Sequence, residues 1–188
     1  VGELVCTAPF PSQPVKFWND PDGSKYKSAY FEHFPGIWRH GDFIKITESG
    51  GVIVHGRSDA TLNRAGVRIG TAEIYGPVEA MPEIEDSLVV EHKIGESTEI
   101  ILFVVLASAT TLDESLTRKI KQTIREQESP RHVPDRIIPI KEVPRTVSGK
   151  KVELAVARIL NGQPVTNRDA LVNPDSLLQF ENLAQDMK

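Results

Sequence analysis

Three segments of this 188-residue chain are richer in charged residues and glycines than folding alone requires. The first is Trp38-Arg39-His40-Gly41-Asp42, in which a carboxylate follows a glycine at the start of an expected strand. A carboxylate in this position is suited to accept hydrogen bonds from both hydroxyls of a ribose. An aspartate beside a glycine is also typical of an ordinary turn, so this segment by itself leaves both interpretations open.

The second segment, Gly56 to Gly70, contains three arginines and three glycines within fifteen residues. Arginine side chains bind phosphate oxygens through paired hydrogen bonds, and glycines allow the backbone to approach a ligand closely. The combination favours a ligand that contains phosphate. A charged hairpin that binds nothing is the competing interpretation.

The third segment, Pro144-Arg145-Thr146-Val147-Ser148-Gly149-Lys150, is typical of a flexible loop with a lysine at its tip. Taken alone, such a loop is most often a solvated turn. Its end is similar to a Walker phosphate-binding loop, but that motif requires glycine where Pro144 stands and serine or threonine where Lys151 stands. The sequence therefore excludes a Walker-type site.

The sequence contains no motif that is typical of a metal site or of a hydrolase. The five histidines form no HxxxH pair and no Cys/His group, so we predict no metal site. There is no Gly-x-Ser-x-Gly motif, and the single cysteine, Cys6, has no histidine beside it, so hydrolase chemistry has no support. One cysteine cannot form an internal disulfide, and we expect a reducing, cytoplasmic location.

Composition limits the classes of partner. The chain has 22 basic and 26 acidic residues, a formal charge of −4 and a sequence pI near 5.8, which argue against nucleic acid as the main partner. The longest apolar run, Ile100 to Ala107, is shorter than the roughly 18–20 residues of a membrane-spanning helix. We therefore expect a globular protein that binds neither nucleic acid nor a membrane.

The secondary structure expected around the three segments changes along the chain. Up to about Arg57 the pattern is all-β, with a hairpin of residues 42–47 and 52–56 joined at Gly50-Gly51. The first expected strand has no partner strand before it and no initiating methionine. These features favour a piece of a longer protein.

A mixed set of strands and helices is expected after Asp59. The elements, in chain order, are a strand through 67–69, a helix from Thr71, strands at 87–91 and 99–106 that pair at the centre of a sheet, a helix at 111–127, a strand at 136–140 and a helix at 151–160. In the helix at 111–127, Thr111 and Glu114 form a capping box, and apolar residues spaced by four cover the sheet. A polar linker at 164–173 and a short amphipathic helix from Pro174 follow.

In this order, the three segments resemble the adenylate-forming superfamily of acyl- and aryl-CoA synthetases, luciferases and nonribosomal adenylation domains. That family shows a Gly-Asp pair, then Gly-Arg-x-Asp leading to Gly-x-Arg-Ile and a glutamate, then Pro-x-Thr-x-Ser-Gly-Lys. The corresponding residues here are Gly41-Asp42, Gly56-Arg57-Ser58-Asp59, Gly66-Val67-Arg68-Ile69 with Glu73, and Pro144 to Lys150. The resemblance covers nearly the whole chain and the last stretch of a much longer enzyme.

The resemblance implies an α+β fold: a small C-terminal lid domain with a short β-sheet flanked by helices, preceded by a β-hairpin remnant of a large N-terminal domain. Residues 1–57 would end the N-terminal adenylation domain, 58–160 would form the lid, and 161–188 would be a linker and short C-terminal helix. The phosphate loop, the adenine pocket and the acyl pocket would all lie outside this chain.

The resemblance also implies a reaction and roles for individual residues. Such an enzyme joins a carboxylic acid to ATP, giving an acyl-adenylate and pyrophosphate, and then rotates its lid so that CoA attacks the adenylate. Lys150 would be the catalytic lysine, in a loop shaped by Ser148 and Gly149. Asp42 and Arg57 would hold the ribose of ATP or AMP.

The remaining roles concern the lid. Asp59 would be the hinge, Arg68 would belong to the ATP and AMP site, and Gly66 and Arg125 would serve CoA, the first by leaving room for its pantetheine arm. The implied cofactors are ATP, CoA and Mg²⁺, with the Mg²⁺ ligands outside this chain. The implied partners are a small carboxylic acid and the N-terminal domain of the same protein. Lys151 departs from the family, whose members often carry an apolar residue there.

Within the superfamily, four stretches look most like the acetoacetate-activating branch, the acetoacetyl-CoA synthetases. They are Phe17-Trp18-Asn19-Asp20, Trp38 to Asp42, Ser58 to Arg64, and Asn173-Pro174. Acetyl- and propionyl-CoA synthetases usually carry threonine where His40 stands, and a fragment of one of these is an alternative. A nonenzymatic module that binds phosphate or a partner is another, although neither Asp59 nor Lys150 is needed for packing.

Overall fold

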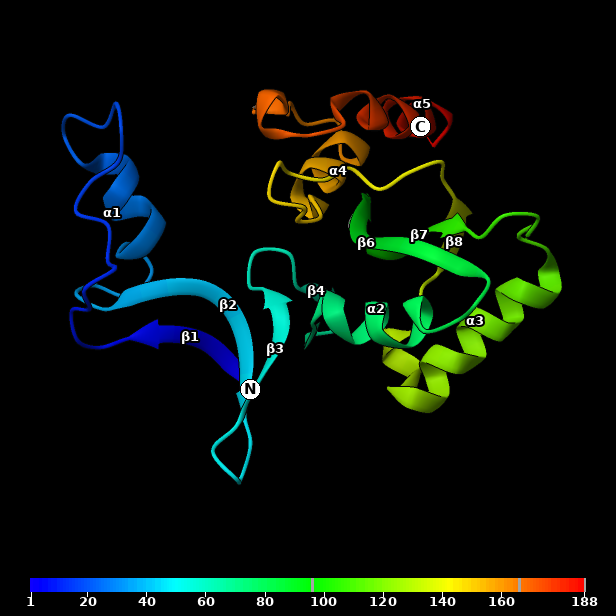
Figure 1. Ribbon diagram of the computed structural model, residues 1–188, viewed down its shortest axis with the longest axis horizontal. Coiled ribbons are helices and arrows are strands. Elements are labelled where there is room, and N and C mark those ends of the chain that lie inside the picture. Colours follow the sequence, from blue (N-terminus) through cyan, green and yellow to red (C-terminus); the bar gives the residue numbers. More distant parts are fainter. Residues whose placement is uncertain (96, 166, 188) are drawn as a thin grey trace. The chain divides into compact units, whose positions relative to one another are not determined.

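The computed structural model describes residues 1–95, 97–165 and 167–187, and the chain divides into two compact units, Val1–Asp59 and Ala60–Lys188 (Figure 1). Among the described residues, no helix has both the length and the apolar character needed to cross a membrane.

The first unit is built on an antiparallel sheet with strand order β1-β2-β3. Its strands are β1 (Gly2–Cys6), β2 (Trp38–Ile46) and β3 (Val52–Arg57). The predicted hairpin is present as β2 and β3, and Gly50 takes a φ of 82° in the connecting turn. A left-handed φ of this kind is what glycine allows at little energetic cost, which explains the residue type at this turn.

The expectation of an all-β first unit is wrong, because residues Ser24–Tyr30 form a helix, α1. The Asp20 carboxylate accepts hydrogen bonds from the N–H groups of Lys25 and Tyr26 at 3.0 and 2.8 Å. Tyr30 stacks on Trp38 of β2 with 3.7 Å between ring centroids. The helix has seven residues and none of them is buried, so its own sequence carries no apolar periodicity that predicts it.

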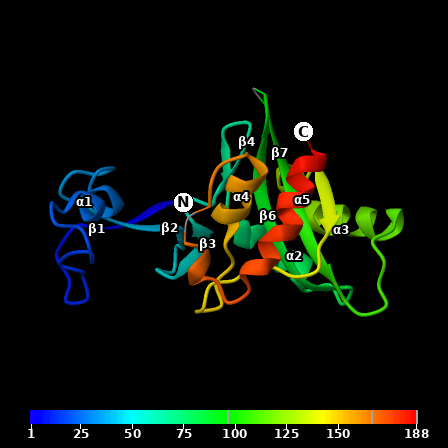
Figure 2. The ribbon, with the colours of Figure 1, turned by 90° about the horizontal axis from the view of Figure 1, so that it is seen from above.

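The second unit contains a sheet with strand order β6-β7-β8 and a separate hairpin of β4 and β5. The strands are β4 (Leu62–Arg64), β5 (Val67–Ile69), β6 (Ile84–Ile94), β7 (Ser97–Leu106) and β8 (Arg136–Pro139). The predicted pairing of β6 with β7 is confirmed, and Figure 2 shows their long antiparallel hairpin. Only β7 is central, however, because β8 pairs in parallel on its other side.

Helices cover both faces of this sheet (Figure 1). On one face lie α2 (Thr71–Glu79) and α3 (Glu114–Gln127), and on the other lie α4 (Glu153–Leu160) and α5 (Leu178–Asp186). Leu102 of β7 belongs to the buried cluster on the first face, whereas Phe103 belongs to the second and meets Phe180 at 5.0 Å between centroids. Because alternate residues of β7 enter the two clusters, the strand is apolar from Ile100 to Leu106.

The start of α3 differs from the expectation. The helix begins at Glu114, and the Asp113 carboxylate accepts the Leu116 N–H at 2.7 Å, so the predicted capping box of Thr111 is wrong. Aspartate is as good a cap as threonine, and the choice between two candidates two residues apart depends on backbone geometry that sequence does not show.

Short 3₁₀ turns among the described residues complete the second unit: η1 (Pro130–His132), η2 (Arg168–Ala170) and η3 (Pro174–Leu177). The helix expected from Pro174 is therefore a 3₁₀ turn that leads into α5. Part of the expected linker also contributes to the core, because Leu171 packs against the cluster beneath α4 and α5.

Candidate functional site

In the first unit, the sheet brings Asp42 and Arg57 together. These residues are cross-strand partners on β2 and β3, and Arg57 Nη1 lies 3.5 Å from Asp42 Oδ1. The same Nη1 donates to the His40 carbonyl at 3.4 Å, and His40 Nδ1 lies 2.8 Å from Asp42 Oδ2. Asp42, Arg57 and His40 therefore form one polar group on β2 and β3.

Gly41 has a steric role in this group. Its φ is 88°, and a Cβ built on it would lie 2.6 Å from Arg57 Nη2, closer than real Cβ contacts. The Glu3 carboxylate fixes the same stretch by accepting the Gly41 N–H at 2.8 Å and by pairing with Arg39 at 3.2 Å. A glycine is therefore required here for the arginine to reach its position.

Asp59, the expected hinge, is exposed and lies at the end of the first unit. Its Oδ1 is 3.6 Å from Arg57 Nε. The division between the two compact units falls directly after it, between Asp59 and Ala60.

In the second unit, Gly66 occupies the tip of the β4–β5 hairpin. Ala65 and Gly66 have φ values of 51° and 83°, and the Gly66 N–H donates to Asn63 Oδ1 at 3.0 Å. A Cβ at Gly66 would have no described heavy atom within 4 Å. The tip is thus open, and the space that a larger side chain would fill is solvent.

The two arginines of this hairpin differ in their contacts. Arg64 pairs with Asp135 at 2.8 Å and donates to the Val133 carbonyl at 2.9 Å, which makes it a structural tie to the loop before β8. Arg68 is exposed and donates to Thr61 Oγ1 at 3.3 Å. Arg125 is also exposed, in the last turn of α3, where a cation is favoured by the helix dipole.

The segment that ends in Lys150 forms a hydrogen-bonded turn. The Gly149 N–H donates to the Thr146 carbonyl at 2.8 Å, and Gly149 takes a φ of 81°. The Lys150 N–H donates to Thr146 Oγ1 at 3.1 Å, and Ser148 Oγ lies 3.0 Å from the same oxygen. Ser148 and Gly149 both take part in the hydrogen bonds of this turn.

The Lys150 side chain is exposed, and its ammonium group makes no hydrogen bond or ion pair with any residue that the structure describes. Its neighbour Lys151 is enclosed, with contacts to Glu79, Asp86 and Ser87. The sequence marks Lys151 as a departure from the family. It does not show these partners, because they lie more than sixty residues away in the chain.

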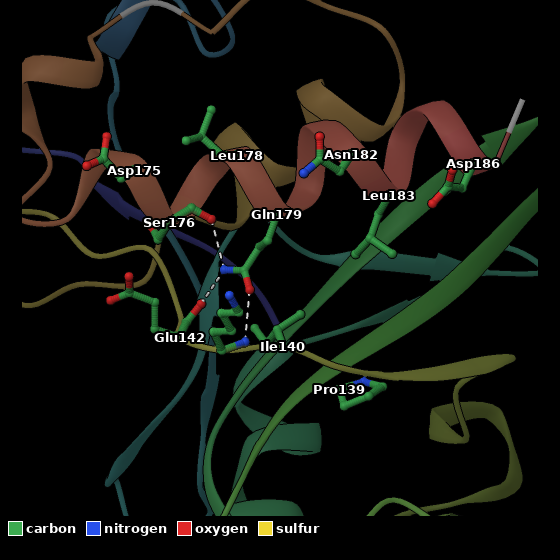
Figure 3. Close-up of a pocket in the computed structure, with 11 residues that line it drawn as sticks. Pro139, Ile140, Glu142, Asp175, Ser176, Leu178, Gln179, Asn182, Leu183 and Asp186 are labelled. Carbon is green, nitrogen blue, oxygen red and sulfur yellow. Dashed lines mark hydrogen bonds between the residues drawn. The ribbon is translucent and has the colours of Figure 1, made fainter.

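A hollow of about 700 Å³ lies between residues 139–142 and α5 (Figure 3). Gln179 spans it by accepting the Lys141 N–H at 2.9 Å and donating to the Glu142 carbonyl at 2.7 Å. No residue named from the sequence as a site residue lines this hollow. The hollow is therefore separate from the residues predicted to form the site.

Glu73, Glu128 and His132 each place one potential metal-ligand atom within 4.8 Å of the others. These residues come from α2, the end of α3 and η1, so the spacing rules that predicted no metal site do not detect them. His132 already has protein contacts: Nδ1 lies 2.8 Å from Ser129 Oγ, and Nε2 lies 3.4 Å from Glu73 Oε2. The second contact joins η1 to α2.

Comparison with known proteins shows what this chain is similar to. The AMP-binding enzyme C-terminal domain matches residues 78–150, which end at Lys150. The chain is 54% identical over 184 residues to acetoacetyl-coenzyme A synthetase of Rhizobium meliloti (strain 1021) and 49% identical over 187 residues to acetoacetyl-CoA synthetase of Gallus gallus. Each match covers 98% of this chain and 28% of the relative.

Solved structures agree with these matches. The acetoacetyl-CoA synthetase from Streptomyces lividans superposes on all of this chain and 28% of its own, with a TM-score of 0.92 and 49% identity. A benzoate CoA ligase from Burkholderia xenovorans LB400 shares the fold over 83% of this chain and 30% of its own, with a TM-score of 0.66 at 22% identity.

The chain therefore contains a match to the AMP-binding enzyme C-terminal domain, as its resemblance to the adenylate-forming superfamily implies. Within that superfamily it is similar, over almost its whole length, to acetoacetyl-CoA synthetases. The chain spans about 28% of the length of the relatives that it matches. The resemblance and the mixed fold drawn from the sequence are both confirmed.

Proposed function

We propose that this chain is the C-terminal part of an ATP-dependent acetoacetate–CoA ligase, an acid–thiol ligase. The observation that carries the proposal is 54% identity to an acetoacetyl-CoA synthetase across 98% of the chain. The whole enzyme joins acetoacetate to ATP, releasing pyrophosphate, and the CoA thiol then displaces AMP from the acyl-adenylate.

Lys150 acts in the first half-reaction. Its ammonium group stabilises the negative charge shared by the attacking carboxylate and the α-phosphate, an electrostatic effect worth several kcal/mol in enzymes. Its exposure and its lack of a partner among the described residues support this role, because an ammonium already paired within the lid would not be available to substrate.

Asp42 and Arg57 hold the ribose hydroxyls, and Arg68 serves the same nucleotide site. Asp59 is the hinge about which the lid turns between the two half-reactions. The position of Asp59 at the boundary of two compact units supports this assignment.

In the second half-reaction, the lid presents the β4–β5 hairpin to CoA. Gly66 leaves room for the pantetheine arm, and Arg125 binds a CoA phosphate. The open surroundings of Gly66 and the exposure of Arg125 support these roles.

The partner of this chain is the N-terminal domain of the same protein, which supplies the acyl and adenine pockets. Exposed apolar side chains on the hairpin of the first unit support such a partner; they belong to Ile46, Val52, Ile53 and Val54. We infer a cytoplasmic location from the single cysteine and the acyl-CoA chemistry.

The test is the substrate preference of the full-length protein. With ATP, CoA and Mg²⁺, we expect kcat/KM for acetoacetate to exceed that for acetate or propionate, and the 188-residue chain alone to form no thioester. A preference for acetate or propionate would assign the chain to that branch. Absence of thioester with all three acids would support the nonenzymatic alternative.

A further inference from the structure

Lys151 lies in a cage of oxygen atoms. Its side chain is only 13% exposed, and its ammonium group donates to the Ser87 carbonyl at 2.7 Å and to the Glu79 carboxylate. The same group lies 3.0 Å from Asp86 Oδ1. Three oxygen partners match the three N–H donors of an ammonium group, so Lys151 has none left for a substrate.

An aromatic ring closes the remaining side of this cage. Lys151 Nζ lies 3.8 Å from the centroid of the Tyr75 ring, within the range of a cation–π contact. The Tyr75 hydroxyl donates to Glu153 Oε1 at 2.9 Å and accepts the Val89 N–H at 3.2 Å. Burial raises the pKa of Tyr75 well above its ordinary value, so the hydroxyl keeps its proton and can donate to Glu153.

Asp86 connects the cage to the other side of the Lys150 turn. Its Oδ1 pairs with Lys151, and its Oδ2 accepts a hydrogen bond from Arg145 Nη2 at 2.6 Å. Arg145 Nη1 also donates to the Gly149 carbonyl at 2.7 Å. Partial burial alone would raise the pKa of Asp86, but the Arg145 hydrogen bond and the Lys151 charge outweigh it and hold that pKa below its ordinary range.

The backbone connects the anchored residues Arg145 and Lys151 to Lys150. Arg145 and Lys151 form an antiparallel bridge, so the two anchored residues face each other across the turn that contains Lys150. Lys151 is held inward by its partners, whereas the Lys150 side chain next to it is exposed.

We propose that Lys151 is a positioning residue: held by Glu79, Asp86 and the Tyr75 ring, it fixes the turn so that Lys150 projects from the lid. This inference rests on the proposed role of Lys150 in adenylate formation. Lys151 itself touches no substrate and acts only through its neighbour.

The kinetic test uses the full-length enzyme with Lys151→Met, which keeps the side-chain length and removes the charge. Lys141→Met is the matched control, since Lys141 is an exposed lysine ten residues earlier. We expect Lys151→Met to slow adenylate formation by about 10- to 100-fold, the size of a small misplacement of a catalytic group. Thioester formation from supplied acetoacetyl-adenylate should stay within about twofold, and the control should change neither rate.

A double-substitution cycle separates positioning from general destabilisation. In a Lys150→Ala background there is no ammonium left to position, so adding Lys151→Met should lower adenylate formation by less than about twofold. The same proportional loss in both backgrounds, or an equal loss in both half-reactions, overturns the proposal.

Amide hydrogen exchange on the 188-residue chain gives a readout that needs no activity. We expect the Thr146 and Gly149 amides, which close the turn, to exchange at least about tenfold faster in Lys151→Met. The amides of β7 should be unchanged. Unaltered exchange in the turn overturns the proposal, even if the rates fall.

If Lys151→Met unfolds the second unit, Glu79→Gln weakens the same cage without removing the lysine. We then expect Glu79→Gln to slow adenylate formation and to speed amide exchange in the turn, and unaltered exchange again overturns the proposal. An inactive wild-type enzyme would refute the proposed function instead. The exchange result would still decide whether Lys151 holds the turn.

Discussion

Gly41 and Arg57 adjoin so closely that residue 41 has no room for a side chain. In Gly41→Ala, the new Cβ would start 2.6 Å from the guanidinium, at a φ of 88° that L-residues avoid. We expect Arg57 to move away from Asp42, the KM for ATP to rise, and the free energy of unfolding to fall by about 1–2 kcal/mol.

Steady-state kinetics of the full-length enzyme and urea denaturation of the chain measure these two effects. Gly2→Ala is the control, because no heavy atom lies within 4 Å of a Cβ there. Wild-type affinity for ATP in Gly41→Ala would show that the Arg57 position is unimportant for the nucleotide.

Among the helices, α3 offers a direct test of its cap. Replacing Asp113 with alanine removes the acceptor of the Leu116 N–H and should lower the free energy of unfolding by about 1 kcal/mol. Thr111→Ala, at the position that the sequence pattern favoured, should change it by much less. Equal effects of the two substitutions in urea denaturation would reject the assignment of the cap.

Asp135 links the β4–β5 hairpin to strand β7, and the stabilisation from this link depends on pH. Its carboxylate pairs with Arg64 at 2.8 Å and accepts the Ile100 N–H at 2.7 Å. Partial burial opposes ionisation, but the hydrogen bonds from Arg64 and Ile100 outweigh it and hold the pKa of Asp135 below its ordinary value. The unfolded chain therefore takes up the proton at a higher pH than the folded chain does.

The stabilisation from Asp135 is consequently complete above its ordinary pKa of about 3.9 and is lost as the pH falls through the lower folded value. We expect wild type to exceed Asp135→Asn in free energy of unfolding by about 1 kcal/mol at neutral pH. The difference should shrink toward zero in strong acid. A difference that is the same at both pH values would contradict this account.

The elements differ in how far the sequence predicts them, and the reason is whether an element's own residues carry a pattern. The helix α3 and the strands β6 and β7 carry runs or periodic sets of apolar residues. The helix α1 has seven residues, none of them buried, and its stacking partner Trp38 lies outside it.

The same distinction applies to the candidate site. Asp42, Arg57 and Lys150 are detectable because they stand in short motifs. The anchors of the Lys150 turn are not, because Arg145–Asp86 and Lys151–Glu79 join residues 59 and 72 positions apart. Only the folded chain shows that these charges meet.

For the chain as a whole, the two units differ in how well they bury their apolar residues. The second unit has a buried cluster on each face of its sheet, whereas Ile46 and Val52 on the hairpin of the first unit are 69% and 58% exposed. We expect amides of β2 and β3 to exchange faster than those of β7, because local opening requires less free energy where few apolar contacts are lost. Equal protection in hydrogen-exchange mass spectrometry would contradict this difference.

We propose that one lid serves two half-reactions through different residues, Lys150 in the first and Gly66 in the second. The most direct measurement compares both half-reactions in full-length Lys150→Ala. Adenylate formation should fall by about 100-fold or more, as when an electrostatic stabiliser is removed. Thioester formation from supplied acetoacetyl-adenylate should stay within about twofold of wild type. An equal loss in both half-reactions would contradict the account.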